Sequence, residues 1–145
     1  MKNLFLTSKM NRSFKGQSIT EFAILLPILM LILIGILDLG RITATYVVVA
    51  NAAREGARFG SLHPNNATGV TNRARAEAQN SVVIPAQLQV SCVTPTPTPA
   101  SCDGAIGSPI RVRATYPFSF ITTYLFAGMS TVNVTVESTF QIQKD

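Results

Sequence analysis

The sequence predicts an α+β protein: a long N-terminal helix, transmembrane in its first half, followed by a small extracytoplasmic domain. Residues 22–37 contain no charged or hydrogen-bonding side chain, which is typical of a membrane helix. Beyond Pro85 the apolar residues alternate with polar ones, which indicates half-buried strands. The 145 residues suffice for one small domain and an anchor.

The apolar run predicts one membrane span. At about 1.5 Å per residue, residues 22–37 cover roughly 24 Å of a hydrocarbon core about 30 Å thick. Extension to Gln17 and Gly40 completes the span but includes Glu21 and Asp38. Because the helical pattern continues beyond the run, we predict one helix over residues 17–60.

Two further patterns lie within this predicted helix. Pro27 removes one backbone donor and should bend the helix locally, a defect that membrane helices tolerate. Ala52, Gly56 and Gly60 recur every fourth residue, which either allows another helix to approach closely or is incidental. Two acid–arginine pairs three residues apart, Asp38–Arg41 and Glu55–Arg58, suit structural ion pairs rather than catalysis.

Residues 61–145 form the predicted extracytoplasmic domain. A loop at residues 61–69 leads into a short helix at 70–83, with Arg73 and Glu77 four residues apart. We predict three strands, whose apolar faces carry Leu88, Val90 and Cys92, then Ile110, Val112, Ala114 and Tyr116, then Val132, Val134, Val136, Phe140 and Ile142. The helical segments 41–60 or 70–83 should cover this apolar face. The connection at 118–130 is apolar enough to be a short buried helix or a contact surface.

The charge distribution predicts topology rather than nucleic-acid binding. Of the net charge of +5, the four basic residues before Glu21 contribute +4, and the remaining eight basic and seven acidic residues contribute +1. A basic stripe on the folded domain, as phosphate binding requires, is therefore not expected. The basic cluster before the span places the N-terminus in the cytoplasm and the domain outside. Residues 1–16 are interpreted as a basic leader.

The cysteines suit a structural bond. Cys92 and Cys102 flank a proline–threonine loop in the outer part of the chain, where a disulfide is permitted; two unpaired thiols are the alternative. A zinc site is not expected, because the sequence has no CxxC and its single histidine precedes a proline in a polar loop. We found no catalytic motif and predict neither an enzyme nor a cofactor.

The first third of the chain carries a family resemblance. Gly16 ends the basic leader, Gln17 would begin a mature chain, and Glu21 and Phe22 stand at the start of the apolar helix. This arrangement resembles type IV pilins and pseudopilins. The continuation "GQSITEFAILLPILMLILIGILDLGR" and then "ANAAREGARFG" closely resembles the TadE-like family, minor pilin-like proteins of the tight-adherence (Flp) pilus.

The resemblance implies a structural function in assembling a surface pilus used in adhesion. It implies cleavage between Gly16 and Gln17 by a prepilin peptidase, and pairing of Glu21 with the new terminal amine of a neighbouring subunit. The expected partners are other pilus subunits, the assembly machinery and membrane lipid, at the bacterial cytoplasmic membrane or in the pilus. The alternatives are an uncleaved single-pass surface protein or a secreted protein cut after residues 50–52.

Overall fold

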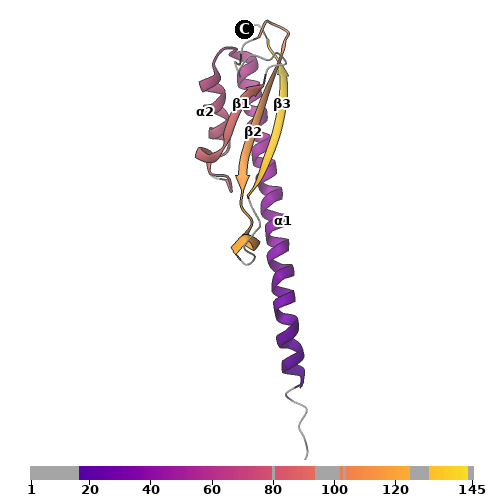
Figure 1. Cartoon of the computed structure of the whole chain (residues 1–145). Coiled ribbons are helices and arrows are strands. Elements are labelled where there is room, and N and C mark those ends of the chain that lie inside the picture. Colours follow the sequence, from indigo (N-terminus) through magenta and orange to yellow (C-terminus); the bar gives the residue numbers. More distant parts are fainter. Residues whose placement is uncertain (1–16, 80, 94–101, 103, 125–130, 144–145) are drawn as a thin grey trace, which may run out of the picture.

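The computed structural model describes residues 17–79, 81–93, 102, 104–124 and 131–143, without the side chains of residues 17, 123 and 124. Helix α1 (Gln17–Leu62) is a long rod, and the rest of the described chain packs along one half of it (Figure 1). The other elements, in chain order, are α2 (Ala67–Glu77), η2 (Pro85–Gln87), β1 (Gln89–Val93), β2 (Pro109–Phe118), η3 (Ile121–Tyr124) and β3 (Val132–Gln141). The predicted α+β class is confirmed.

Helix α1 has two halves with different surroundings. In the apolar half, residues 18–37, the large side chains other than Ile34 are exposed, Ile24 by 71% and Leu25 by 60%. In the packed half, residues 38–62, buried residues recur three or four positions apart and form one face of the helix. The helix runs through Pro27 without interruption. A single helix thus leaves the domain as an exposed apolar rod, the one candidate membrane span among the described residues.

The sheet is antiparallel, and β2 is its central strand. Val112 of β2 pairs with Cys92 of β1 and with Ser138 of β3. Along β2 the inward residues Ile110, Val112, Ala114, Tyr116 and Phe118 are buried, whereas Arg111 and Arg113 face outward. The strict alternation of β2 follows from its central position, where one face meets the core and the other meets solvent.

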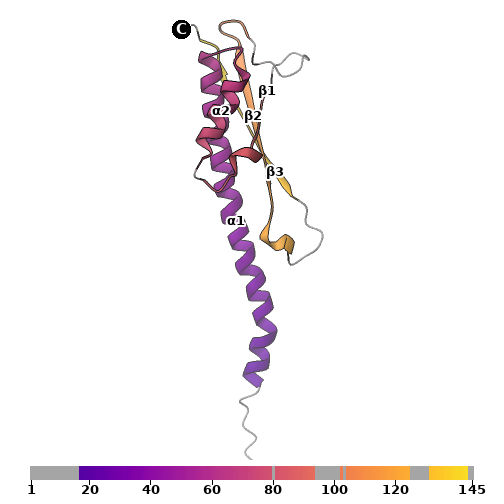
Figure 2. The ribbon, with the colours of Figure 1, turned by 90° about the vertical axis from the view of Figure 1, so that its left-hand side faces the viewer.

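Both helices lie on one face of the sheet, so the domain has two layers (Figure 2). The packed half of α1 lies along β2 and β3, and α2 lies beside β1. Both helical segments that the sequence offered as partners for the sheet therefore cover it. The two groups of buried side chains are Val49, Ala52, Ala53, Ala74, Ala78, Val83, Leu88, Ala114, Tyr116, Phe118 and Val134, and Ala57, Val70, Cys92, Cys102, Ile110, Val112 and Ile142.

The small-residue stripe on α1 has a packing function within the chain. A Cβ atom built on Gly56 would lie 3.3 Å from the Cβ of Ala74 on α2 and 3.4 Å from Cγ1 of Val112 on β2. At Gly60 the nearest atoms belong to Ile110 and Val70. The stripe therefore lets α2 and β2 approach α1 closely, and the helix that it admits is α2 of the same chain.

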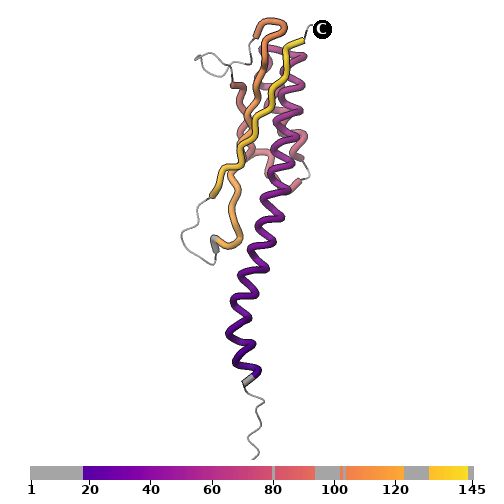
Figure 3. The backbone as a smooth tube through the Cα atoms, turned by 90° about the vertical axis from the view of Figure 1, so that its right-hand side faces the viewer, coloured from indigo at the N-terminus to yellow at the C-terminus, as the bar shows by residue number. Residues whose placement is uncertain are grey.

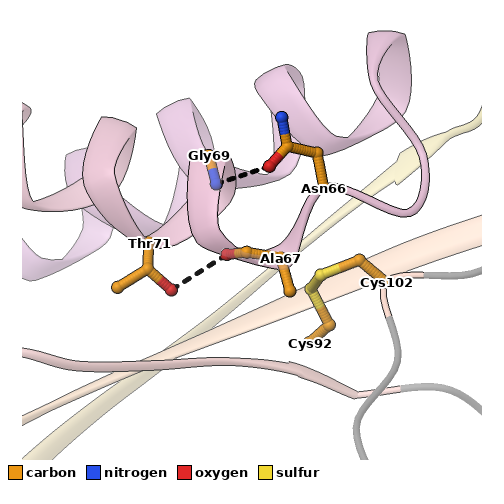
Figure 4. The surroundings of a disulfide bond; sticks show 6 residues. All are labelled: Asn66, Ala67, Gly69, Thr71, Cys92 and Cys102. Atoms are coloured by element: carbon orange, nitrogen blue, oxygen red, sulfur yellow. Dashed lines mark hydrogen bonds between the residues drawn. A yellow bond between two sulfur atoms is a disulfide. The ribbon is translucent and has the colours of Figure 1, made fainter.

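Cys92 and Cys102 form a disulfide, with Cα atoms 5.3 Å apart. The bond lies beside the first turn of α2, where the side chain of Asn66 accepts a hydrogen bond of 2.8 Å from the amide of Gly69 (Figure 4). The carbonyl of Cys102 accepts a further bond from the amide of Asn65. The disulfide therefore ties β1 to the start of α2, and the predicted pairing is confirmed. Most of the loop between the cysteines lies outside the described residues.

Helix α2 and the outer end of β3 differ from the sequence-based prediction. α2 spans Ala67–Glu77, so the predicted range 70–83 begins and ends too late. Asn66 caps the helix, and this capping signal lay inside the segment assigned to the loop. Phe140, predicted on the apolar face, is 38% exposed because β3 is an edge strand.

Replacement of Gly56 by leucine should separate α1 from α2 and β2. We expect a loss of about 1–3 kcal/mol in the free energy of unfolding, the usual cost of overpacking. Gly40→Leu is the matched control, because a Cβ atom there meets nothing within 4 Å. It should be neutral, or stabilising by up to about 1 kcal/mol through helix propensity. Thermal unfolding of the full chain in detergent, followed by circular dichroism, checks this. Equal stability of the two variants would contradict the packing.

Candidate functional site: the long helix and its attachments

The residues that the resemblance marks as functional lie at the start of α1. Gly16 lies outside the described residues, and the helix begins at Gln17. Glu21 and Phe22 are both exposed, Phe22 by 59%. The start of α1, which carries these residues, is the end of the rod that is far from the domain (Figure 1).

The apolar half of α1 carries a shallow groove beside Phe22. Leu25, Ile28, Leu29 and Ile32 complete its lining. These positions follow the three- and four-residue spacing of one helix face. An apolar groove of this kind fits the side chains of a second helix or lipid chains.

Asp38, at the first position after the apolar half, is attached to the connection between β2 and β3. Its side chain is buried although it is charged. One carboxylate oxygen accepts a bond of 2.9 Å from the amide of Ile121, and the other accepts bonds of 3.1 Å from the amide and the hydroxyl of Thr122. A buried carboxylate requires such donors, so this contact fixes the start of η3 against α1.

Arg41 completes this attachment, which we call the Asp38 clamp: Asp38, Arg41, Phe118, Ile121 and Thr122. The guanidinium donates to Asp38 over 3.2 Å and lies 5.1 Å from the centre of the Phe118 ring. The predicted Asp38–Arg41 pair is therefore confirmed, but it is only part of a larger cluster. Sequence reasoning missed Ile121 and Thr122, because nothing in the sequence indicates which distant amides meet a carboxylate. The nearest signal was the unusual apolar character of the 118–130 connection.

A second charged cluster, the Glu55 clamp, joins the packed half of α1 to α2. Glu55 accepts bonds of 2.8 and 2.9 Å from Arg58 and one of 3.0 Å from Arg73 of α2. The predicted Glu55–Arg58 pair is thus confirmed. Arg73, which lies four residues before Glu77 on α2, forms its ion pair with Glu55 of α1. The Glu55 carboxylate and Arg73 line a small surface hollow with Ala76 and Glu77.

The Glu55 clamp affects the titration of its carboxylate. Hydrogen bonds from Arg58, followed by those from Arg73 and the charges of both, lower the pKa of Glu55 below its ordinary value of 4.5, against an opposing effect of burial. The contribution of the clamp to stability is therefore complete above pH 4.5. It is lost as the pH falls through the lowered pKa, because the protonated acid no longer attracts the two arginines.

The described residues contain no group of three or more histidine, cysteine, aspartate or glutamate side chains able to hold a metal ion. The two charged clusters are each closed by arginines or backbone donors of the same chain. Their geometry suits attachment of elements to α1.

The substitution Glu55→Gln should remove the pH-dependent part of the α1–α2 attachment. Above pH 5 we expect a loss of about 1 kcal/mol or less, the range of exposed ion pairs. Below pH 4 the difference from the wild type should shrink, because the wild-type carboxylate is itself being neutralised. The control is Glu77→Gln, which lies on the same side of α2 as Arg73 and leaves the clamp intact. Its difference in unfolding free energy from the wild type should not change comparably with pH. Urea unfolding at pH 3.5 to 7 measures this; a pH-independent difference for Glu55→Gln would refute it.

Residues 16–58 of the chain match the family model described as TadE-like protein. The matched range covers less than half of the chain and ends within α1. Comparisons with curated proteins and with solved structures gave no match. The TadE-like family is pilus-associated, and structural rather than catalytic. The match confirms that, over residues 16–58, this chain is similar to the TadE-like proteins associated with the Tad pilus.

Proposed function

We propose that this chain is a pilin-like structural subunit for assembly of the tight-adherence pilus, without chemistry of its own. The observation that carries the proposal is the coincidence of the family match with α1. The match begins at Gly16, the residue before the helix, and includes the whole apolar half. In this proposal a prepilin peptidase removes residues 1–16, and the apolar half anchors the chain in the cytoplasmic membrane with its domain outside.

The proposal gives Glu21 a definite electrostatic function. Cleavage after Gly16 would create a cationic amine at Gln17, four residues before the exposed carboxylate of Glu21. At the centre of a bilayer an uncompensated charge costs about 2.5–3.5 kcal/mol on insertion scales. Pairing of Glu21 with the amine of a neighbouring subunit would lower this cost in both chains. It would thereby favour one register between packed helices.

The surface of α1 offers contacts on which other pilus subunits could pack. The groove that begins at Phe22 provides an apolar face in the apolar half. Beyond the span, Tyr46 and Val47 on the packed half are 55% and 50% exposed. An exposed apolar face that continues past the span suits a neighbouring helix parallel to α1, because lipid covers only the first part.

Processing can be tested at the residue before the helix. The mature chain should begin at Gln17, as measured by mass spectrometry of protein extracted from its own membrane. Gly16→Leu should leave full-length chain in the membrane, because the bulky side chain obstructs the peptidase site. Ser13→Leu, which adds the same bulk within the leader, is the control and should still be cut. Native protein that retains residues 1–15 would refute processing and favour the uncleaved surface protein.

The pairing of Glu21 can be tested by separating charge from shape. Glu21→Ala and Glu21→Gln should both reduce pilus yield and co-purification of other pilus subunits, since neither variant can neutralise an amine. Glu21→Asp keeps the charge and should retain part of the function. Membrane insertion should survive in all three, as should cleavage, because Gly16 is unchanged. Ser18→Ala, one turn away, is the control.

Normal piliation by both Glu21→Ala and Glu21→Gln, at protein levels matched to the wild type, would refute the pairing. Glu21 would then be an interfacial residue near the helix N-terminus, where a negative charge is favourable without a partner subunit.

A further inference from the structure

We propose that the surface around the Asp38 clamp is a second membrane contact, at which the domain rests in the phospholipid headgroup layer. We call this surface the membrane rim: Arg41, Ser119, Phe120 and Ile121. The inference rests on the proposed anchoring of α1. It adds that lipid contacts the domain itself, through a segment far from the anchor in the sequence.

The length of the apolar half sets the depth of Asp38 in the bilayer. Residues 18–37 at about 1.5 Å per residue are about 30 Å long, the thickness of a hydrocarbon core. Asp38 is the next residue, so it lies at the outer boundary of that core. Its carboxylate is within 2.9–3.1 Å of the amides of Ile121 and Thr122. The start of η3 is therefore held at the same height, within the headgroup layer.

The shape of the domain supports this placement. The end of β2 and the start of β3 lie at the end of the sheet nearest to the apolar half of α1, and η3 lies there beside the helix (Figure 3). The disulfide lies toward the opposite end of the sheet, where Cys92 pairs with Val112 rather than with the Phe118 end of β2. Of the described parts of the domain, the membrane rim is thus the part that faces the bilayer.

The chemistry of the membrane rim fits a lipid interface. Ile121 is 36% exposed, so its apolar atoms are available to the upper acyl chains. The side chain of Arg41 is 43% exposed although its guanidinium also contacts Asp38. An exposed cation beside exposed apolar groups is the composition of segments that bind phospholipid surfaces, where phosphates lie above the hydrocarbon.

Asp38 is the positioning residue of this surface. Its two oxygens bind donors on η3, so the membrane rim keeps a fixed height relative to the span. Without the carboxylate, the start of η3 would lose its three hydrogen bonds to Asp38 and could move out of the headgroup layer. If Asp38 has only a structural function, its loss should change only the stability of the domain. If it also positions the membrane rim, its loss should change the depth of Ile121 in the bilayer as well.

Depth-dependent fluorescence quenching tests the proposal on the full chain. The described cysteines are both in the disulfide, so a new cysteine can be labelled selectively without reductant. Ile121→Cys and, separately, Ser119→Cys would carry an NBD label in phosphatidylcholine–phosphatidylglycerol vesicles. Leu29→Cys reports the span, and Thr139→Cys reports the outer face of β3. The quenchers are nitroxide lipids, spin-labelled either at the headgroup or deep in the acyl chain.

The headgroup nitroxide should quench the labels at 121 and 119 more than the acyl nitroxide does. Its quenching of these labels should exceed its quenching of the label at 139 by a factor on the order of two, since the headgroup layer is only several ångströms thick and the label at 139 lies outside it. The label at 29 should be quenched by the acyl nitroxide. If the label at 29 is quenched but the labels at 119 and 121 are quenched no more than the label at 139, the membrane rim is refuted and the anchor stands. If 29 is not quenched, the anchor itself is refuted, and the membrane rim with it.

The substitution Asp38→Ala tests the positioning. Combined with the label at 121, it should reduce headgroup quenching toward the level at 139, while quenching at 29 stays unchanged. Retained quenching at 121 would refute the positioning function of Asp38. A different outcome is that the label at 121 shows no quenching by the nitroxide lipids and becomes shielded from solvent only after other pilus subunits are added. That result would assign the surface to a protein partner and overturn the proposal.

Discussion

The continuity of α1 is the constraint on which the rest of this structure depends. One unbroken helix has an apolar half whose side chains are exposed and a packed half that forms the centre of the domain core. In lipid a helix satisfies its own backbone hydrogen bonds, and in the domain it offers a straight face for packing. The domain is therefore a layer of short elements attached to an existing rod.

The two charged clamps attach this layer to α1 at two positions along the helix. The Asp38 clamp holds the connection between β2 and β3 near the apolar half, and the Glu55 clamp holds α2 farther along the helix. Directly beyond Glu55, the small residue Gly56 allows close packing against α2 and β2. Apolar contact supplies most of the attraction, whereas the clamps fix position along the helix, since a carboxylate bound to specific donors has one acceptable register.

The disulfide compensates for the small size of the layer. The residues after α1 are few, and a domain of this size buries a modest apolar area. Closing a loop of this length adds roughly 2–3 kcal/mol by restricting the unfolded chain. The bond also links β1, an edge strand, to Cys102, whose carbonyl accepts a hydrogen bond from Asn65 just before α2. A short domain can thus remain folded while attached to a long, exposed helix.

The sequence by itself determined the local features: the apolar run, the alternation of β2, the cysteine pair and the pairs Asp38–Arg41 and Glu55–Arg58. Each depends on residues close together in the chain or on a simple period. The residues at the cleavage site and Glu21 could be marked only through the family resemblance, and their functions remain proposals. The early start of α2 was missed because the cap Asn66 was assigned to a loop.

Only the tertiary structure decided which distant groups meet. In the fold, Asp38 binds the amides of Ile121 and Thr122. The small-residue stripe packs against α2 of the same chain rather than against another subunit. Such contacts depend on the height at which the sheet packs along α1, a sum of many weak interactions that no short stretch of sequence encodes.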